Sequence, residues 1–126
     1  MEDQTADIYQ KVGSDGPFYR LVDAFYEGVI QDSVIRPMYP FDLEPGKKHL
    51  AQFLIQRFGG PSDYSNDRGH PRLRMRHVSF KIGVTERDAW VHHMRNAVLT
   101  VPEFTPYMSE IMEYFDSTAT FMINSE

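Results

Sequence analysis

The sequence contains no cysteine. This absence excludes disulfide bonds, iron–sulfur clusters, cysteine-based zinc sites and any thiolate-ligated cofactor. A metal ion bound by this chain must therefore be held by histidine, carboxylate, tyrosine or methionine side chains.

The sequence also lacks long apolar runs and an excess of positive charge. No run approaches the roughly 18 residues that a membrane span needs, and the first residues lack the basic-then-apolar pattern of a signal peptide. Thirteen lysine and arginine residues against eighteen aspartate and glutamate residues give a formal net charge of -5. Because phosphate binding needs a dense positive surface, a general nucleic-acid role is disfavoured. We expect a cytoplasmic protein without a membrane span.

Sustained alternation of apolar and polar residues, internal repeats and low-complexity segments are missing as well. Strands are therefore not expected. The length of 126 residues and the hydrophobic content of 41% suit one domain over residues 1–126. The aromatic content of 13% and the seven methionines indicate a thick, adaptable core. We predict an all-α domain of five or six helices.

The clearest helix is expected over residues 17–31, where apolar side chains recur at steps of three and four. Asp15-Gly16-Pro17 is a typical start signal, and Pro37 and Pro40 break the pattern beyond it. The expected inward face consists of Phe18, Leu21, Val22, Phe25, Tyr26, Val29 and Ile30.

Four further helices are expected, over residues 45–58, 72–78, 85–101 and 105–123. Residues 62–71 are polar and predict a loop, and prolines predict a break at residues 102–106. Thr85 to Asp88 resembles a capping box for the third of these helices. The inward faces of the last two are expected to hold Trp90, Met94, Ala97, Val98 and Val101, and Met108, Ile111, Met112, Phe115, Ala119 and Met122.

The five histidines are the candidate metal ligands: His49, His70, His77, His92 and His93. The adjacent pair at 92 and 93 points roughly 100° apart on a helix and cannot chelate one ion. No His-x-x-x-His or Glu-x-x-His motif is present, which disfavours a non-haem metalloenzyme.

His77 has a distinctive setting, because it ends an arginine-rich segment and precedes Val78 and Phe80. An apolar wall suits an axial base for haem, and nearby cations suit the haem propionates. The same segment is equally compatible with an ordinary solvated basic face, so spacing alone leaves both interpretations open.

Several blocks strongly resemble group II truncated haemoglobins. They are Gly59-Gly60-Pro61, Tyr64-Ser65 and the run Arg68-Gly69-His70-Pro71-Arg72-Leu73-Arg74-Met75-Arg76-His77. The resemblance continues, in matching order and spacing, through Phe25-Tyr26, Met38-Tyr39-Pro40, Glu86-Arg87-Asp88-Ala89-Trp90 and Ile123-Asn124-Ser125. It implies a truncated globin-like two-over-two helical sandwich around haem b.

The resemblance implies that His77 is the proximal iron ligand and that Tyr26, Tyr39 and Trp90 form the distal side. Phenol and indole groups are hydrogen-bond donors that can sit in an apolar pocket, so these residue types suit a polar diatomic ligand. Taken without the resemblance, Tyr26 and Trp90 are better explained as core residues. His70 is expected to have a structural role.

Other cofactor contacts are expected from the same comparison. Leu50, Phe53 and Leu54 would line the distal pocket or the haem edge, and Met75 and Met94 would pack on the haem. The propionate contacts would come from Tyr64 and Arg76, with His49 or Lys48 as further candidates.

The chain departs from the family pattern at three places. Gly13-Ser14 replaces a glycine pair, Phe58 stands where a tryptophan is common, and the segment from Phe41 to Gly46 is one residue shorter. This shortening places Gly46, or alternatively Lys47, at the small distal gate. Gly46 would leave an open entrance, whereas Lys47 could reach a propionate.

The function expected from the resemblance is reversible binding of oxygen, and of nitric oxide or carbon monoxide, for oxygen transport or storage. The alternative is a haem enzyme with peroxidase-like or nitric oxide dioxygenase activity, served by an unknown reductase. A proximal carboxylate partner would favour O–O cleavage, and no aspartate is identifiable for that role. A haem-free helical interaction module is a third hypothesis. The sequence leaves homo-oligomer formation open.

Overall fold

The computed structural model describes residues 5–69, 72, 75, 77 and 80–125. Every regular element within these residues is a helix, as expected. The elements are α1 (Ile8–Val12), α2 (Gly16–Ile30), η1 (Arg36–Met38), α3 (Glu44–Arg57), α4 (Asp63–Arg68), α6 (Val84–Leu99), η2 (Pro102–Tyr107) and α7 (Met108–Phe121). None of the described helices is long and apolar enough to cross a membrane.

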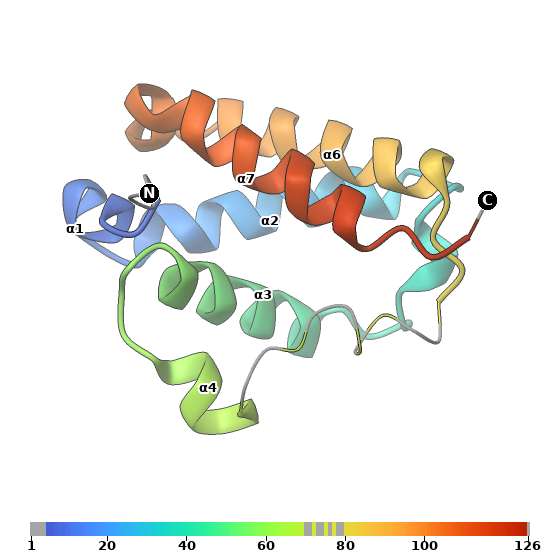
Figure 1. Cartoon of the computed structure of the whole chain (residues 1–126), viewed down its shortest axis with the longest axis horizontal. Helices are drawn as coiled ribbons and strands as arrows, with labels where there is room; N and C mark the ends of the chain where they lie inside the picture. Colours follow the sequence, from blue (N-terminus) through green and yellow to red (C-terminus); the bar gives the residue numbers. More distant parts are fainter. Residues whose placement is uncertain (1–4, 70–71, 73–74, 76, 78–79, 126) are drawn as a thin grey trace.

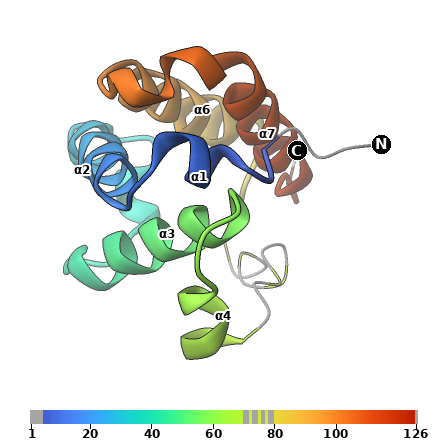
Figure 2. The same ribbon diagram turned by 90° about the vertical axis from the view of Figure 1, so that its left-hand side faces the viewer.

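Two pairs of helices form the fold. The first pair is α2 with α3, the second is α6 with α7, and α2 also packs against α6. In Figures 1 and 2, α6 and α7 run side by side above α3, and α4 lies below α3. The predicted all-α, two-over-two arrangement is confirmed.

Phenylalanine rings connect the two pairs through the core. Phe18 on α2 meets Phe104 on η2 edge to face, with ring centroids 5.1 Å apart. Phe58, at the end of α3, meets Phe115 on α7 at 6.2 Å. All four rings are fully buried, so each makes the dispersion contacts of a close-packed interior.

The predicted inward face of α2 is confirmed with one exception. Phe18, Leu21, Val22, Phe25, Tyr26 and Val29 are buried, but Ile30 is 53% exposed. Ile30 is the last residue of the helix, so the apolar periodicity of the buried face ends there. Including it in the core was wrong.

The expected loop at residues 62–71 was also wrong in part, because residues 63–68 form α4. Gln56 on α3 holds this short helix through two hydrogen bonds. Its side-chain amide donates to Ser65 Oγ (2.7 Å), and its Oε1 accepts the Ser65 N–H (2.9 Å). A tertiary contact of this kind leaves no periodic signal in six polar residues. The helix expected over residues 72–78 lies largely outside the described residues.

The start of α6 differs from the predicted capping box. Glu86 Oε1 accepts the N–H of Gly83 at 2.7 Å, so the helix begins at Val84 and the partner is Glu86 rather than Asp88. The predicted break at residues 102–106 is the 3-10 helix η2, and the last helix begins at Met108 rather than at residue 105.

Candidate functional site

Three aromatic residues from three different elements meet at one end of the fold. Tyr26 comes from α2, Tyr39 follows η1, and Trp90 lies on the second turn of α6. The Tyr26 and Tyr39 rings are 5.6 Å apart at 75°, and the Trp90 side chain hydrogen-bonds to the Tyr39 phenol. The structure therefore brings together the three residues that were predicted as distal donors.

Burial keeps both phenols in their neutral form. It raises the pKa of Tyr26 to about 12. Burial also raises the pKa of Tyr39, the nearby Tyr26 raises it further, and the hydrogen bond from Trp90 acts in the opposite direction. Both hydroxyls therefore remain protonated at neutral pH and can donate hydrogen bonds.

The chain that carries Tyr39 is fastened by Arg36. The Arg36 guanidinium donates to the carbonyl oxygens of Tyr39 (3.1 Å) and Pro40 (3.2 Å) and reaches that of Phe41 (3.5 Å). These bonds satisfy backbone groups in a segment without regular structure. Nothing in the sequence singles out Arg36, since its contacts are with backbone atoms and leave no motif.

A second attachment of this corner comes from α6. His93 Nε2 lies 2.6 Å from Asp32 Oδ2, and Asp32 Oδ1 accepts the N–H of Val34 at 2.8 Å. From the sequence, His93 was expected to matter only as a candidate metal ligand. The structure instead gives it a carboxylate partner just beyond α2.

Of the two candidates for the gate position, Gly46 lies next to the Tyr26 hydroxyl, whereas Lys47 lies over the Tyr26 ring. A Cβ atom added to Gly46 would lie 2.8 Å from Tyr26 Oη. The Lys47 ammonium lies 6.0 Å from the centre of the Tyr26 ring and pairs with Glu44 (3.5 Å) and Asp23 (3.9 Å). Because glycine has no side chain, position 46 leaves the space that the Tyr26 hydroxyl oxygen occupies.

The apolar residues predicted to surround the cofactor lie on α3, α4 and α6. Phe53, Leu54, Tyr64 and Met94 are buried, and Leu50 is half-buried. The Phe53 and Tyr64 rings meet edge to face at 5.4 Å. These buried residues belong to the same apolar cluster as Tyr26, and Tyr39 and Leu50 pack against that cluster.

The predicted propionate contacts are less clearly placed. His49 Nδ1 lies 3.1 Å from the Arg68 guanidinium, and Lys48 is exposed. Met75 is 59% exposed, and Arg76 and His70 lie outside the described residues. The cofactor contacts of these side chains stay predictions.

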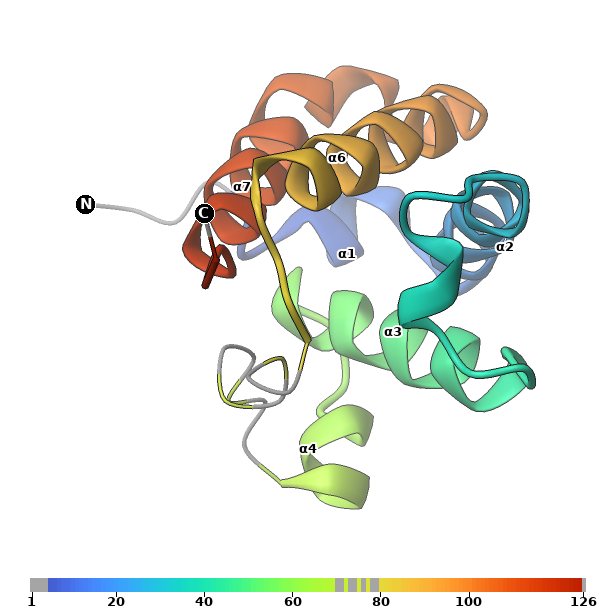
Figure 3. The same ribbon diagram turned by 90° about the vertical axis from the view of Figure 1, so that its right-hand side faces the viewer.

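His77 is half-buried, and its ring centre lies 6.2 Å from that of Phe80. Its carbonyl oxygen accepts the N–H of Phe80 (3.0 Å) and the side-chain amide of Asn124 (3.4 Å). In Figure 3, the segment that enters α6 and the corner around η1 lie at opposite sides of the interval between α3 and α6. His77 precedes the first of these segments, and Tyr39 follows the second.

This donor set fits a haem. It includes an imidazole that could serve as an axial base, neutral hydrogen-bond donors from other elements, and buried apolar side chains on α3 and α6. In the described part of the chain, no group of three or more histidine or acidic residues could hold a metal ion directly. The histidines at 92 and 93 have other partners, Asn96 (3.2 Å) and Asp32.

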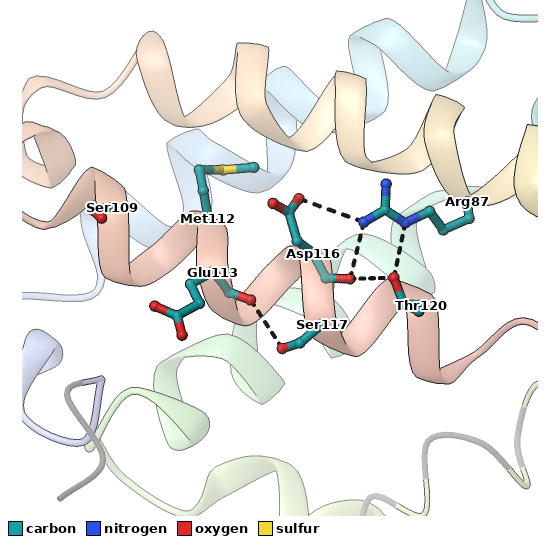
Figure 4. Close-up of a pocket in the computed structure, with 7 residues that line it drawn as sticks. All are labelled: Arg87, Ser109, Met112, Glu113, Asp116, Ser117 and Thr120. Carbon is teal, nitrogen blue, oxygen red and sulfur yellow. Dashed lines mark hydrogen bonds and ion pairs between the residues drawn. The ribbon is translucent and has the colours of Figure 1, made fainter.

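A separate shallow pocket lies along α7 and is closed on one side by Arg87 (Figure 4). The Arg87 guanidinium donates to Thr120 Oγ1 (3.1 Å) and to the carbonyl oxygen of Asp116 (3.3 Å). None of the predicted site residues that the structure describes lines this pocket. Arg87 therefore joins α6 to α7 there.

Comparisons with known proteins agree on one family. The model of the bacterial-like globins matches residues 7–124. A group 2 truncated haemoglobin of Bacillus subtilis (strain 168) is 35% identical over 92% of this chain and 87% of its own length.

Solved structures show the same relationship. The haemoglobin of the thermophilic phototrophic bacterium Chloroflexus aurantiacus is 48% identical, with a TM-score of 0.90 over 94% of this chain and 98% of its own. The truncated haemoglobin of Bacillus subtilis, described as oxygen-avid, is 34% identical, with a TM-score of 0.88 over 94% and 99% of the two chains.

Proposed function

The chain belongs to the bacterial-like globin family, among the group 2 truncated haemoglobins, and from this premise we propose that it binds haem b through His77 and binds oxygen reversibly. Family membership implies haem binding. The use of His77 as the axial ligand, the b-type haem and a role in oxygen transport or storage are the parts that we propose.

The observation that carries the proposal is the convergence of Tyr26, Tyr39 and Trp90 from three elements. Haem, when bound, supplies an iron that takes oxygen, nitric oxide or carbon monoxide as a ligand. The two phenols would donate hydrogen bonds to such a ligand, and the raised tyrosine pKa values keep the phenol protons in place. The single N–H of the indole, which bonds to the Tyr39 phenol in this structure, would donate to the ligand by exchanging that partner.

The expected effect of these donors is slow ligand release. A hydrogen bond to a charged acceptor contributes about 1.5–3 kcal/mol, and about 1.4 kcal/mol corresponds to a factor of ten in an equilibrium constant. Two or three such bonds would therefore favour strong retention of oxygen. The oxygen-avid Bacillus subtilis relative supports this expectation.

The remaining residues would bind and shield the cofactor. Phe53, Leu54 and Met94 supply buried apolar surface, which excludes water and strengthens the hydrogen bonds made inside the site. His77 would supply the axial nitrogen. Tyr64 and Arg76 are proposed as propionate contacts.

The axial ligand is tested with His77→Ala, using His92→Ala as a matched control because His92 is exposed on α6 and bonded to Asn96. The ferrous protein and the control should show the absorption spectrum of five-coordinate, histidine-ligated haem, and His77→Ala should lose tightly bound haem. A normal five-coordinate ferrous spectrum in His77→Ala would disprove the assignment.

The gas-binding role is tested by stopped-flow kinetics on the reduced protein with oxygen and nitric oxide. Trp90→Phe removes one donor and should release oxygen about tenfold faster, the effect of one bond of about 1.4 kcal/mol. An unchanged rate would mean that the indole does not reach the ligand. Rapid oxidation by nitric oxide with efficient re-reduction would instead favour the dioxygenase activity.

A further inference from the structure

Asn124, three residues beyond the end of α7, is bonded to the chain that lies between His77 and α6. Its Oδ1 accepts the N–H of Ile82 at 2.9 Å. Its side-chain amide donates to the carbonyl oxygen of Phe80 at 2.9 Å and to that of His77 at 3.4 Å. One asparagine side chain thus uses both its acceptor and its donors on a single stretch of backbone.

The main chain around Asn124 reinforces this attachment. The N–H groups of Asn124 and Ser125 both donate to the carbonyl oxygen of Ile82, at 2.9 and 3.1 Å. Ile82 and Gly83 are buried, and Gly83 donates to Glu86 at the start of α6. The backbone polar groups of Ile82 and Gly83 are therefore held from two directions, by the segment after α7 and by the first turn of α6.

The segment bonded to Asn124 has no regular secondary structure to define its backbone conformation. Residues 80–83 belong to no helix, and the bonds from Asn124 to Ile82, Phe80 and His77 span 42 to 47 positions along the chain. A buried backbone group without a partner costs about 1–3 kcal/mol. The Asn124 side chain removes this cost at Ile82 and defines where the His77 and Phe80 carbonyls lie.

We propose that Asn124 is a positioning residue that fixes the backbone from which the His77 imidazole is presented to the haem iron. This inference rests on the proposed function, since it requires His77 to be the axial ligand. Residues that orient a ligand from outside its coordination shell usually change metal affinity about 10–100-fold when they are mutated. Asn124 would act through the main chain of His77, since its side-chain hydrogen bonds among the described residues go to the backbone of His77, Phe80 and Ile82.

Two variants separate the parts of this attachment. Asn124→Ala removes the acceptor and both donors, whereas Asn124→Asp keeps an acceptor for Ile82 N–H and loses the donors to the His77 and Phe80 carbonyls. Asn96→Ala is the matched control, because Asn96 is an exposed asparagine on α6 whose side chain bonds to His92. The backbone bonds from residues 124 and 125 to Ile82 remain available in all three variants.

The readouts are the iron–histidine stretching band of the reduced holoprotein, measured by resonance Raman, and the rate of haem transfer to an excess of a haem-scavenging apoprotein. We expect both Asn124 variants to shift or broaden the band and to lose haem about tenfold faster than wild type. Asn96→Ala should match wild type. Circular dichroism verifies the fold, and Asn124→Asp serves alone if Asn124→Ala does not fold.

An unchanged stretching band in the Asn124 variants would overturn the positioning role. Faster haem loss with an unchanged band would also overturn it, because it would limit Asn124 to packing. The His77→Ala variant distinguishes the two proposals. If that variant keeps a histidine-ligated spectrum, the proposed function fails; if it loses the spectrum while the Asn124 variants retain the wild-type band, only the inference about Asn124 fails.

Discussion

Asp32 and His93 form a partly buried pair that joins α6 to the corner following α2. His93 Nε2 lies 2.6 Å from Asp32 Oδ2, and the two side chains are 14% and 22% exposed. The same carboxylate accepts the N–H of Val34. Because Tyr39 lies on the chain that follows this turn and Trp90 lies one turn before His93, the pair supports both sides of the tyrosine–tryptophan cluster.

The pair predicts a contribution to stability that disappears in acid. The hydrogen bond from His93, followed by that from Val34 N–H, holds the pKa of Asp32 below its ordinary value. A carboxyl whose pKa is lowered in the folded protein stabilises it above the unfolded value of about 3.9 and loses this effect as the pH falls through the folded-state pKa.

Denaturant unfolding of wild type and Asp32→Asn over pH 3–7 measures this contribution. The free energy of unfolding of wild type should exceed that of Asp32→Asn at pH 5, where the carboxylate is charged, and the difference should shrink below about pH 4. Asp67→Asn, an exposed position on α4, is the control. A difference that does not change with pH would contradict the prediction.

Gly28 permits the close approach of His93 to α2. A Cβ atom at position 28 would lie 2.5 Å from His93 Nδ1. Gly28→Ala should therefore turn the imidazole away from Asp32 and destabilise the protein by up to about 2 kcal/mol, which is the overpacking cost of about 1–3 kcal/mol less the gain of about 1 kcal/mol in helix propensity. Thermal unfolding measures the change, and Gly16→Ala on the same helix, where a Cβ meets nothing within 4 Å, is the control.

The double variant Gly28→Ala, His93→Ala tests whether the loss of stability comes from the contact between the added Cβ and the His93 imidazole. With the imidazole removed, alanine at position 28 should be neutral or stabilising relative to His93→Ala alone, because only the propensity gain remains. The same loss with and without His93 would mean that another contact is responsible.

Periodicity predicted the long helices because burial of one face dictates which residues recur. The spacing of Phe18, Leu21, Val22 and Phe25 identifies the inward face of α2, and all four are buried. The same reasoning failed for Ile30 and for α4, where end effects and the hydrogen bonds between Gln56 and Ser65 decide the outcome.

The candidate site was predictable only through family resemblance. Tyr26 and Trp90 have the spacing of core residues, and nothing local indicates that the indole reaches the Tyr39 phenol. The bonds from Asn124 to the His77 segment and from His93 to Asp32 join residues 47 and 61 positions apart. Single polar pairs at such separations produce no pattern in the sequence.

Gly46 is predicted to control the position of the Tyr26 hydroxyl. Because an added Cβ would lie 2.8 Å from Tyr26 Oη, Gly46→Ala should displace the phenol and weaken its hydrogen bond to the gas. We expect the oxygen dissociation rate to rise about tenfold, as for loss of about 1.4 kcal/mol. Stopped-flow ligand replacement measures it.

Tyr26→Phe provides the reference for this effect. If Gly46 acts through the hydroxyl, adding Gly46→Ala to Tyr26→Phe should change the dissociation rate little, because the displaced group is already absent. A further tenfold rise in the double variant would show that residue 46 affects ligand escape by a route separate from Tyr26.

Gly59 and Gly13 form a natural pair for separating backbone strain from steric overlap. Both have a positive φ, +99° and +95°, but a Cβ at Gly59 would lie 1.9 Å from the carbonyl oxygen of Ala6, whereas one at Gly13 meets nothing within 4 Å. Gly13→Ala should cost about 1–2 kcal/mol from the left-handed conformation alone. Gly59→Ala should cost that amount and about 1–3 kcal/mol more, because the added Cβ overlaps the carbonyl oxygen of Ala6. The overlap would force residues 5–9 away from the end of α3, where Tyr9 N–H donates to the Phe58 carbonyl oxygen. Denaturant unfolding gives both values, and equal losses at the two positions would contradict the packing of residues 5–9 against α3.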